Sequence, residues 1–494
     1  MNYKYVFWDF NGTLIDDVGN ALACVNDMLK RKNRKPITLD QYYTYVETPI
    51  VGFYRHILPP EELDFEEISR DYHKDYQTHL DITFLAEGAT HLLERLKSDG
   101  VKQYIITAIS QEEVEALTKK YGIYDYFEKI LGADNNLAES KLQRAKEFFD
   151  TLAIDPSQAI LIGDTLHDLE TASALGIDCI LVNYGHQGKR LLSENNAFSV
   201  DTLKDVESIL FDTRFIDLHA HSTSSDGSDT PQELVQKAKE AGLSAIALTD
   251  HDSVEGIAAA QKEAEKIGIE FIPGIEFSIA GKKQCHIVGL YIDPENPRLL
   301  EVSNTLRSNR TGRMAQICRN LQNMGFDITF EECEKLAGED FIGRAHIGKM
   351  LVDKGYCSSI DEAFNKYIGP NGPAYVGKAP FPPEEAIKAI RDAGGVAFLA
   401  HLHLTSDSTD ELDDMLKRFK EAGLNGIEGY YSTYTYEHIK AFRALAVKHS
   451  LAFSGGSDYH GEMKPHISLG KGLGKLNIPY FVLQNIKNIH NSQN

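Results

Sequence analysis

Several features are missing from this sequence, and each absence narrows the classes of protein to which the chain can belong. No stretch approaches the roughly 20 consecutive apolar residues that a membrane-spanning helix needs. The six cysteines form no Cys-x-x-Cys pair, which favours reduced thiols over a disulfide framework. The N-terminal segment MNYKYVFWDF runs straight into a strand pattern and lacks the features of a cleavable signal. We therefore expect a cytoplasmic protein with no membrane-embedded part.

Positive charge is also scarce. Lys and Arg together number 51 against 73 Asp and Glu, which gives a formal net charge of −22 at pH 7. Such a chain is poorly suited to wrapping long nucleic acids, because neutralisation of phosphates dominates that affinity. A small phosphorylated ligand needs only a local basic pocket and stays compatible with this balance. The length of 494 residues exceeds one ordinary core and predicts two or more domains.

The first domain is predicted over residues 1–205. Strand patterns alternate with amphipathic helical segments, which predicts a doubly wound parallel sheet. These patterns are YKYVFWDF, QYIITAIS, AILIGDT and CILVNYG. Residues from about 16 to 86 are helical and rich in aromatic side chains, and we predict a helical cap there.

The alternation restarts after a seam near residues 203–214, and a second α/β domain is predicted over residues 214–494. Its strand patterns are FIDLHAHS, AIALTDHD, FIPGIEFSI, CHIVGLYI, FLAHLHL, GIEGYY and AFSGGSDYH. Several end in His, Asp or Glu, and in a parallel α/β barrel the chemistry lies at the carboxyl ends of the strands. The alternation of strand and helix patterns stops between about residues 293 and 376, and we predict a helical insertion there.

Metal-competent side chains are concentrated at these strand ends. They lie in the segments DLHAHSTSSDG (217–227), TDHD (249–252), GIE (274–276), HIVG (286–289), AH (400–401) and SDYH (457–460). A His-x-His on a strand points both imidazoles to the same face. Imidazole and carboxylate together suit Zn, Mn or Fe, whereas Ca prefers oxygen ligands. A lone histidine usually serves no metal, but this many strand-end ligands indicate a metal centre.

These segments resemble the PHP family (polymerase and histidinol phosphatase domains) over about residues 214–479. The resemblance implies a distorted (β/α)7 barrel that holds three divalent metals, which we expect to be Mn, Fe or Zn. It implies that one metal is held by His219, His221, Glu276 and Asp458. A second would be held by Asp226, His251 and His460, and a third by His286 and His401 with Glu276 bridging.

The expected chemistry follows from the ions. Two metals about 4 Å apart lower the pKa of a bridging water, and the resulting hydroxide attacks phosphorus in line. The general acid for the leaving oxygen stays open between His346 and metal-bound water. Asp217, Asp250 and Asp252 are candidates for fixing the orientation of the imidazoles, or serve as turn and capping residues.

The predicted insertion carries basic residues. Arg307, Arg310 and Arg313 recur every third position and line one helical face, which taken singly is best interpreted as a solvated surface. The segment IGRAHIG adds Arg344 and His346. Arginine suits phosphate because its planar fork donates two parallel hydrogen bonds.

IGRAHIG and the following residues 351–376 resemble one PHP branch, whose members release the 3′-phosphate of nucleoside 3′,5′-bisphosphates or trim short RNA from its 5′ end. The resemblance implies that Arg344 and His346 act in catalysis and contact the substrate, with Arg307 as a further substrate contact. One departure is AHLHL, where the branch usually has Pro after AH. Strand alternation would place His403 on the face of His401, as an extra ligand, a substrate contact or an ordinary barrel residue.

Residues 1–205 resemble the haloacid dehalogenase superfamily through DFNGT (9–13), Thr107, Lys141 and GDTLHD (163–168). The resemblance implies that Asp9 is a nucleophile that forms an aspartyl-phosphate. Thr107 and Lys141 would bind the phosphate, and Asp9 and Asp164, joined by Asp168, would hold or orient Mg²⁺. Phosphatases of this superfamily place Asp two residues after the nucleophile as general acid and base. This chain has Asn11, whose amide cannot shuttle a proton at neutral pH.

We therefore expect a metal-dependent phosphohydrolase that releases phosphate from a small, nucleotide-like phosphomonoester, such as a nucleoside 3′,5′-bisphosphate, and that can act on short RNA ends. Two alternatives stay open. The second domain can be a histidinol-phosphate-type phosphatase, although that activity should not need the insertion. The first domain can instead sense a phosphate ligand and regulate the second, with weak or no activity of its own. The sequence leaves the oligomeric state open.

Overall fold

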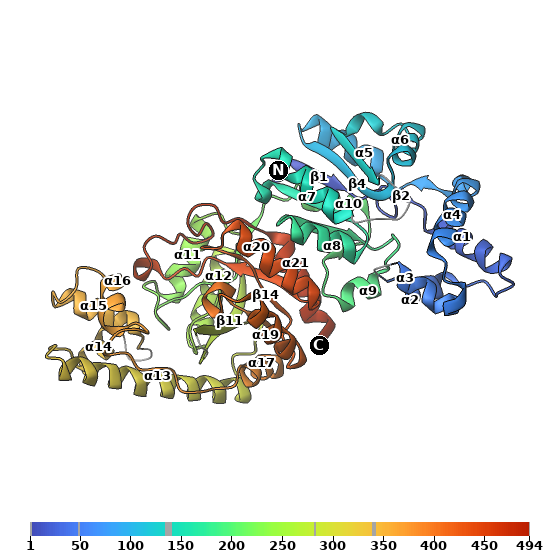
Figure 1. Ribbon diagram of the computed structural model, residues 1–494. Helices are drawn as coiled ribbons and strands as arrows, with labels where there is room; N and C mark the ends of the chain where they lie inside the picture. Colours follow the sequence, from blue (N-terminus) through green and yellow to red (C-terminus); the bar gives the residue numbers. More distant parts are fainter. Residues whose placement is uncertain (1, 48–49, 134–140, 281–282, 338–341, 494) are drawn as a thin grey trace. The chain divides into compact units, whose positions relative to one another are not determined.

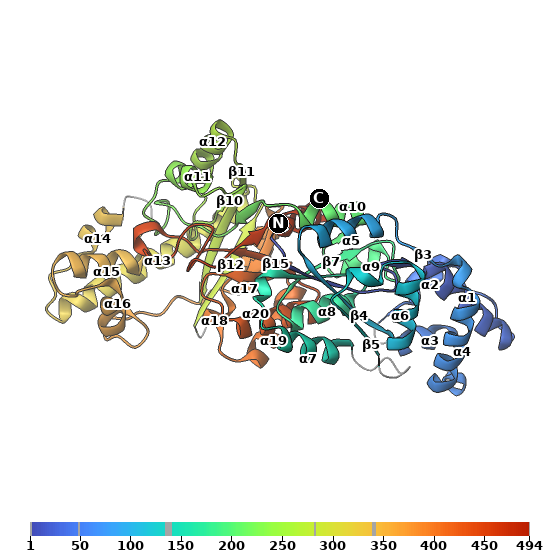
Figure 2. The same ribbon diagram turned by 90° about the horizontal axis from the view of Figure 1, so that it is seen from above.

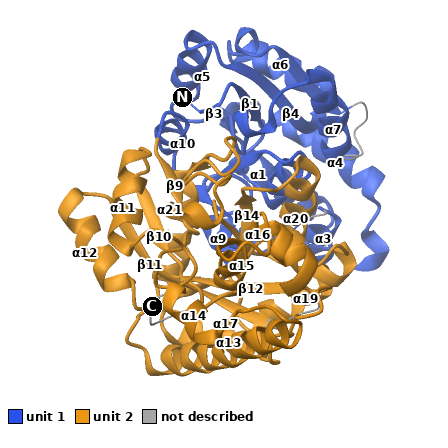
Figure 3. Cartoon of the chain, turned by 90° about the vertical axis from the view of Figure 1, so that its left-hand side faces the viewer, with its two compact units in different colours: residues 1–213 blue, residues 214–494 orange. Residues whose placement is uncertain are grey.

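The computed structural model consists of two compact units, Met1–Thr213 and Arg214–Asn494. Figure 3 shows these units in blue and orange. The structure describes residues 2–47, 50–133, 141–280, 283–337 and 342–493. Across these residues, every helix is too short or too polar to cross a membrane.

Unit 1 is built on a parallel sheet with the order β5-β4-β1-β6-β7-β8. The chain runs outward from β1 in one direction and then in the other, so the predicted doubly wound sheet is confirmed. β1 lies at the point where the strand order reverses, which is where open α/β sheets bind ligands. The strands are β1 (Tyr5–Trp8), β4 (Lys102–Ser110), β5 (Lys129–Ala133), β6 (Ala159–Gly163), β7 (Asp178–Val182) and β8 (Ser199–Val200).

Helices cover this sheet and also form a separate layer. The helices that connect the sheet strands are α5 (Ala89–Ser98), α6 (Gln111–Lys120), α7 (Lys141–Leu152), α8 (Leu166–Ala174) and α9 (Lys189–Glu194), and α10 (Leu203–Leu210) follows the last strand. The separate layer contains α1 (Val18–Arg31), α2 (Leu39–Tyr45), α3 (Val51–Ile57) and α4 (Phe65–Thr78). It has a hydrophobic cluster of its own, and the antiparallel pair β2 (Ile15–Asp16) and β3 (Phe84–Leu85) lies at its base. Figure 1 shows α1 to α4 beside the sheet of unit 1.

Unit 2 is a nearly closed barrel with the strand order β15-β14-β13-β12-β11-β10-β9-β16. Closure occurs where the Leu218 amide donates to Gly455 O at 3.1 Å and where Ala220 bridges to Tyr459. The predicted distorted barrel is therefore confirmed, with β16 as a short addition to β9. The strands are β9 (Phe215–Asp217), β10 (Ala245–Leu248), β11 (Glu270–Ala280), β12 (Gln284–Leu290), β13 (Val396–Leu399), β14 (Gly426–Tyr431), β15 (Ala452–Gly456) and β16 (Ile478–Pro479).

The distortion of the barrel lies at β12, which is antiparallel to both β11 and β13. Only residues 281–283 separate β11 from β12. A parallel connection needs a crossover of a dozen or more residues, so this spacing forces the chain to reverse. The long segment between β12 and β13 then contains the insertion.

The remaining helices surround the barrel or build the insertion. Those around the barrel are α11 (Pro231–Glu240), α12 (Ile257–Ile267), α17 (Pro383–Asp392), α18 (Leu402–Thr405), α19 (Thr409–Glu421), α20 (Tyr436–Lys448) and α21 (Tyr480–Gln493). The insertion contains α13 (Pro297–Asn323), α14 (Phe330–Ala337), α15 (Arg344–Asp353) and α16 (Ile360–Ala363). Figures 1 and 2 both show α14, α15 and α16 grouped beside α13.

The long helix α13 joins two hydrophobic cores. Asn296 caps it by accepting from the Arg298 and Leu299 amides, and Pro297 at its first position needs no amide partner. Its first half packs Leu299, Val302 and Leu306 into the barrel core. Its second half packs Met314, Ile317 and Leu321 into a separate core of the insertion. The arginines at 307, 310 and 313 therefore lie where the helix passes from one core to the other.

Candidate metal centre

The nine predicted ligands of unit 2 lie in or just after the barrel strands or, for Asp226, in the loop after β9. Three groups have ligand atoms within 4.8 Å of one another: His221, Asp226, His251 and His460; His219, His221 and Asp458; and His251, Glu276 and His286. His401 joins the last group through its Nε2, 3.0 Å from Glu276 Oε1. The barrel thus brings the whole predicted set together at one end, where the parallel strands finish and the antiparallel strand β12 begins.

Glu276 is the centre of this cluster. Its Oε1 lies 2.9 Å from His286 Nδ1, and its Oε2 lies 2.8 Å from His251 Nδ1. The same Oε2 is 3.4 Å from His219 Nε2 and 3.3 Å from His221 Nε2. One fully buried carboxylate therefore faces imidazoles carried by three strands, β9, β10 and β12, and a further imidazole, His401, after the end of β13.

The surroundings of the cluster carboxylates favour their ionised form, which is the form that binds metals. Burial opposes ionisation of Glu276, yet the neighbouring His251 and His286 hold its pKa well below the usual value. The pKa of Asp226 is held low against burial by His251 and His460, and that of Asp458 by Lys464 and His460. Asp226 Oδ1 lies 3.3 Å from His460 Nε2, and Asp458 Oδ1 lies 3.3 Å from His221 Nε2.

Polar atoms inside the cluster lack the partners that buried groups normally have. His401 Nδ1 is buried and makes no hydrogen bond to any described residue, and Asp226 Oδ1 faces the His460 ring without the geometry of a hydrogen bond. The Nε2 atoms of His219 and His221 face each other at 3.1 Å. Imidazoles and carboxylates aimed at a common centre are the donor set for Mn, Fe or Zn, so these residues fit a group of divalent metals.

Supporting residues appear that the sequence did not reveal. Glu428 on β14 accepts at Oε1 from His219 Nδ1, 2.6 Å away, and at Oε2 from the His401 amide at 2.6 Å. Asp458 Oδ2 accepts from Tyr431 Oη and from Lys464 Nζ, each at 2.7 Å. Glu428 lies inside β14 rather than at its end, and its strand pattern GIEGYY contains no signal that marks it as a partner of the ligands.

Three acidic residues beside the ligands have a different role from orienting imidazoles. Asp217 accepts from the Ser457 and Gly470 amides at 2.9 and 2.8 Å, which ties β9 to the β15 side of the barrel. Asp250 accepts from the backbone and hydroxyl of Ser222, each at 2.7 Å, and Asp252 accepts from the Ser278 amide at 2.8 Å. These carboxylates fix loop backbone, which is the turn role that the sequence left open for them beside the orientation of imidazoles.

His403 does not join the cluster. Strand β13 ends at Leu399, and a short helix, α18, begins at Leu402, so strand alternation does not extend to residue 403. His403 Nε2 instead lies 3.0 Å from Thr433 Oγ1, and its ring packs among Tyr431, Tyr434 and His438. The prediction that it shares the face of His401 is wrong.

The insertion residues occupy different environments. His346 is buried at the start of α15, where its Nδ1 accepts from the Gly343 amide at 3.1 Å. Burial lowers the pKa of His346, and Asp226 opposes that shift, which places the ring within electrostatic range of the cluster. Arg344 lies over the rings of Phe364 and Tyr375, at 5.3 and 5.5 Å from their centroids.

The arginines of α13 are not a solvated face. Arg307 pairs with Glu255. Arg310 binds Asp252 Oδ2 at 2.5 Å, and Arg313 is only 8% exposed. Helical spacing placed them on one face correctly, but that face turns toward the barrel.

Unit 1 contains a second cluster at the carboxyl edge of its sheet. Asp9 follows β1, Asp164 follows β6, and Lys141 begins α7. Lys141 Nζ donates to both Asp9 and Asp168, and burial raises the pKa of Asp9 to about 6 despite this cation. Asp9, Asp164 and Asp168 present carboxylate oxygens within 4.8 Å of one another, which fits a hard ion such as Mg²⁺.

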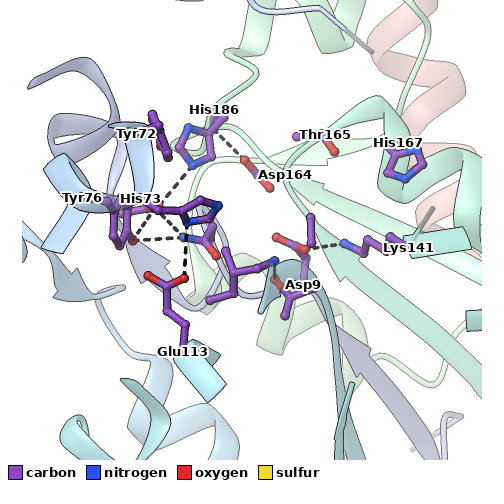
Figure 4. Close-up of a pocket in the computed structure, with 15 residues that line it drawn as sticks. Asp9, Tyr72, His73, Tyr76, Glu113, Lys141, Asp164, Thr165, His167 and His186 are labelled. Atoms are coloured by element: carbon purple, nitrogen blue, oxygen red, sulfur yellow. Dashed lines mark hydrogen bonds and ion pairs between the residues drawn. The ribbon is translucent and has the colours of Figure 1, made fainter. Parts of the chain in front are cut away.

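A cavity of about 240 Å³ opens over this cluster and is lined by Asp9, Thr107, Lys141 and Asp164 together with residues of the α1–α4 layer. Figure 4 shows Lys141 pointing toward Asp9, with His186 next to Asp164. The structure thus brings together the residues predicted for phosphate and metal in this unit.

Asn11 lines the same cavity, but its amide is held by neighbours. Its Nδ2 donates to Asp17 Oδ2 at 2.7 Å and to Tyr76 Oη at 3.1 Å. Tyr76 Oη in turn donates to Asp17 Oδ2 at 2.8 Å, and the Gly12 amide donates to Asp17 Oδ1 at 2.8 Å. Asp17 therefore fixes Asn11 with both amide hydrogens engaged.

Comparison with known proteins assigns both units. The PHP domain model matches residues 217–364, and the haloacid dehalogenase-like hydrolase model matches residues 6–182. A 3′,5′-nucleoside bisphosphate phosphatase from Chromobacterium violaceum is 35% identical over 250 residues, covering 50% of this chain and 87% of that protein. The chain belongs to the PHP family. Its first unit is a haloacid dehalogenase-like hydrolase domain.

Other relatives agree with this PHP assignment. The 5′-3′ exoribonuclease Rnm of Escherichia coli is 34% identical over 260 residues, covering 52% of this chain and 88% of that protein. A solved amidohydrolase structure from Chromobacterium violaceum, with bound SO4 and no metal, has 31% identity and a TM-score of 0.51. It covers 56% of this chain and 96% of that one. For unit 1, a phosphoglycolate phosphatase of Neisseria meningitidis is 31% identical and covers 40% of this chain and 87% of that protein. The PHP-family chain is a hydrolase of phosphoesters.

Proposed function

We propose that unit 2 releases phosphate from a small nucleotide-like phosphomonoester, with a nucleoside 3′,5′-bisphosphate as the substrate class. The observation that carries the proposal is the cluster around Glu276, which lies beside a basic insertion. The cluster supports hydrolysis of a phosphoester, and the relatives named for nucleoside bisphosphate and for RNA support a nucleotide. Some activity on the 5′ end of short RNA belongs to the same proposal.

In this proposal, one set of residues binds the metals and another residue supports those ligands. Three divalent metals would be held by His219, His221, Glu276, Asp458 and the other predicted ligands. Such metals lower the pKa of water and offset the charge that builds on a phosphoryl group during attack. Glu428 fixes the ring of His219 and the backbone of His401 beside these ligands.

His346 is proposed to donate a hydrogen bond from its neutral ring to the leaving oxygen. Its Nδ1 accepts from the Gly343 amide, so a proton on the ring is carried by Nε2. The ring of His346 is buried, which limits its contact with water. Arg344 and Arg307 are proposed as substrate contacts. A metal-bound water stays the alternative donor.

The test is phosphate release from a matched set of substrates with Mn²⁺ present. We expect the highest kcat/KM with a nucleoside 3′,5′-bisphosphate, a lower value with a nucleoside 5′-monophosphate, and slow trimming of a 5′-phosphorylated short RNA. Histidinol phosphate belongs in the set, because its preferential hydrolysis would support the alternative phosphatase. Failure to release phosphate from any nucleotide would rule out the substrate class.

A second candidate function concerns unit 1. Asp9, Lys141, Asp164 and the cavity above them support binding of a phosphoryl group together with Mg²⁺. Because Asn11 replaces the proton-transferring group, we propose that this unit handles phosphate slowly, either as a weak phosphohydrolase or as a sensor that regulates unit 2. Comparing residues 214–494 with the full chain tests the regulation: equal activity toward every substrate argues against it.

A further inference from the structure

The cavity over Asp9 in unit 1 has two walls of different chemical character. One wall holds the side chains that suit a phosphoryl group and Mg²⁺, which are Asp9, Lys141 and Asp164. The other, which we call the distal wall, is formed by Tyr72, His73, Tyr76 and Glu113. Figure 4 shows the distal wall on the far side of Asp9 from Lys141. A ligand that fills the cavity therefore meets a phosphate site at one end and a different set of groups at the other.

The cavity has room for more than a phosphate group. Its volume of about 240 Å³ is more than ten times the roughly 10–15 Å³ that one water needs. The alcohol part of a phosphomonoester can therefore occupy the space between the phosphate site and the distal wall. The chemistry of that wall then determines which alcohol is accepted.

Glu113 supplies the charge of the distal wall. It lies in the first turn of α6, which is capped by Ser110 Oγ accepting from the Glu113 amide at 3.2 Å, so the Glu113 side chain is not needed for the cap. Its Oε1 accepts from Gln77 Nε2 at 2.7 Å. Its Oε2 lies 3.7 Å from His73 Nδ1, beyond hydrogen-bond distance, and makes no hydrogen bond to any described residue. This oxygen is available to a donor on a ligand, and at 12% exposure its charge is weakly screened by water.

Asp17, the other carboxylate near this wall, is already fully engaged. Its Oδ2 accepts from Asn11 Nδ2 and from Tyr76 Oη at 2.7 and 2.8 Å. Its Oδ1 accepts from the Gly12 amide at 2.8 Å and lies 3.2 Å from His186 Nε2. Asp17 therefore has no oxygen left for a ligand, and Glu113 is the carboxylate that can bind one here.

Cations that could offset Glu113 are scarce around the cavity. Among the described residues, Lys141 is the only Lys or Arg in the lining. Its ammonium donates to Asp9 and Asp168 at the phosphate site. The distal wall thus carries a negative charge that no lysine or arginine of the described lining neutralises.

Two tyrosine rings complete the distal wall. Tyr72 and Tyr76 are one turn apart on α4 and share a face of that helix, with ring centroids 6.0 Å apart. The hydrogen bond from Tyr76 Oη to Asp17 fixes one of the rings. The electron-rich face of a tyrosine attracts a cation that lies within about 6 Å of its centroid. Tyrosine rings together with an available carboxylate suit an ammonium group and disfavour a carboxylate.

We propose that unit 1 binds the phosphomonoester of a small amino alcohol. The phosphoryl group lies at Asp9 and Lys141, and the ammonium group lies at Glu113 beside the rings of Tyr72 and Tyr76. The inference rests on the phosphate-handling role proposed for unit 1 and deepens it by naming the substrate class. A phosphate ester that ends in a carboxylate meets Glu113 with like charge and is rejected.

Three two-carbon phosphate esters test the proposal. O-Phosphoethanolamine ends in an ammonium group, 2-hydroxyethyl phosphate in a hydroxyl and 2-phosphoglycolate in a carboxylate. Calorimetry with Mg²⁺ measures their binding to the full-length Glu276→Gln chain, in which turnover by unit 2 is suppressed. Because a charge-assisted hydrogen bond is stronger than a neutral one, phosphoethanolamine should bind about 10- to 100-fold more tightly than 2-hydroxyethyl phosphate. Phosphoglycolate should bind most weakly of the three.

Substitutions in the same background assign the preference to the distal wall. Glu113→Gln should lower the preference for ammonium over hydroxyl at least about 10-fold and leave the affinity for 2-hydroxyethyl phosphate within about twofold. Glu112→Gln is the matched control, since Glu112 is the exposed neighbour on α6 and lies outside the described lining. Phosphocholine carries a cation without N–H donors, so Tyr72→Leu should weaken its binding about 2- to 30-fold through loss of the ring alone.

Two further results separate this inference from the function on which it rests. Lys141→Gln should abolish binding of all three esters, which places them in unit 1. Equal binding of the three esters in both the parent background and Glu113→Gln, with unchanged melting temperatures, would overturn the amino-alcohol site but keep the phosphate-handling role. Tighter binding of phosphoglycolate than of phosphoethanolamine would overturn it as well. If none of the esters and no inorganic phosphate bound, the phosphate-handling role of unit 1 would itself be wrong.

Discussion

Glu428 Oε1 lies 2.6 Å from Nδ1 of His219, and both side chains are fully buried. Burial opposes protonation of His219, yet Glu428 and Glu276 raise its pKa well above the usual value. The other oxygen of Glu428 accepts from the His401 amide, at a residue whose φ of 28° is strained for a side chain other than glycine. The Glu428 carboxylate thus orients the imidazole of His219 after β9 and holds the strained turn at His401 after β13.

Glu428→Gln should weaken metal binding by about 10- to 100-fold, the range seen when a group behind a metal ligand is removed. The amide keeps the size of the side chain but loses the charge and one acceptor. Metal content after dialysis, measured by mass spectrometry, checks the prediction. Glu437→Gln, at an exposed pair with Lys440, is the control. Unchanged metal content in Glu428→Gln would show that the contact is only structural.

Glu276→Gln should lower phosphate release by unit 2 at least about 100-fold, the scale for loss of one preorganised electrostatic group. The carboxylate faces His251 and His286 through different oxygens, and an amide cannot replace both contacts. Phosphate release with saturating Mn²⁺ measures the effect, and Glu301→Gln on the exposed face of α13 is the control. Wild-type turnover in Glu276→Gln would refute its place at the centre of the cluster.

Both folds can be predicted from the sequence because buried strands and the residues at their ends form recognisable local patterns. Buried strands such as AIAL and strand-end residues such as His251 or Asp458 can be recognised from neighbouring positions alone. Glu428 could not be recognised in the same way, since GIEGYY resembles any buried strand. Its role depends on contacts with His219 and His401, which lie in distant segments of the chain.

The predictions for His403 and for the arginines of α13 failed for the same reason, because each depends on tertiary structure that a local sequence pattern does not contain. Strand alternation predicts one shared face for His401 and His403, but β13 ends at Leu399 and helix α18 begins at Leu402, so His403 Nε2 meets Thr433 Oγ1 instead of the ligands. Helical spacing placed Arg310 and Arg313 on one face without showing which face is covered. That depends on α13 packing against two cores, and residue periodicity does not encode it.

Asp9→Asn should leave phosphate release by unit 2 unchanged if the two sites work independently. Asp9 contacts Lys141 within unit 1, and the clusters around Asp9 and Glu276 share no described residue. The kcat/KM for the best nucleotide substrate, measured in the full chain, checks this expectation within about twofold. A large loss or gain would instead support regulation of unit 2 by a phosphate ligand of unit 1.

Asn11→Asp should accelerate loss of a phosphoryl group from Asp9. In the parent protein, an acyl phosphate can transfer its phosphoryl group to an Asp9 oxygen, because the P–O bond breaks to release a carboxylate that needs no proton. Hydrolysis of the product does need a base to take a proton from water, and an amide cannot serve. We therefore expect a mass increase of about 80 Da on Asp9 with acetyl phosphate and Mg²⁺, which is the net addition of HPO₃ when the carboxylate becomes an acyl phosphate.

General base catalysis contributes about 10²–10⁴-fold, so the lifetime of this adduct should shorten by that order in Asn11→Asp. The new carboxylate would face Asp17 Oδ2, which now accepts from Asn11 Nδ2 at 2.7 Å. The pair Asn11→Asp with Asp17→Asn restores a donor and removes the like charge, so it should hydrolyse the adduct at least as fast. Asp9→Asn should form no adduct. Equal lifetimes in the parent and in both Asn11 variants would show that another group in the cavity supplies the base, and His186, which lines the same cavity, would be the first to replace.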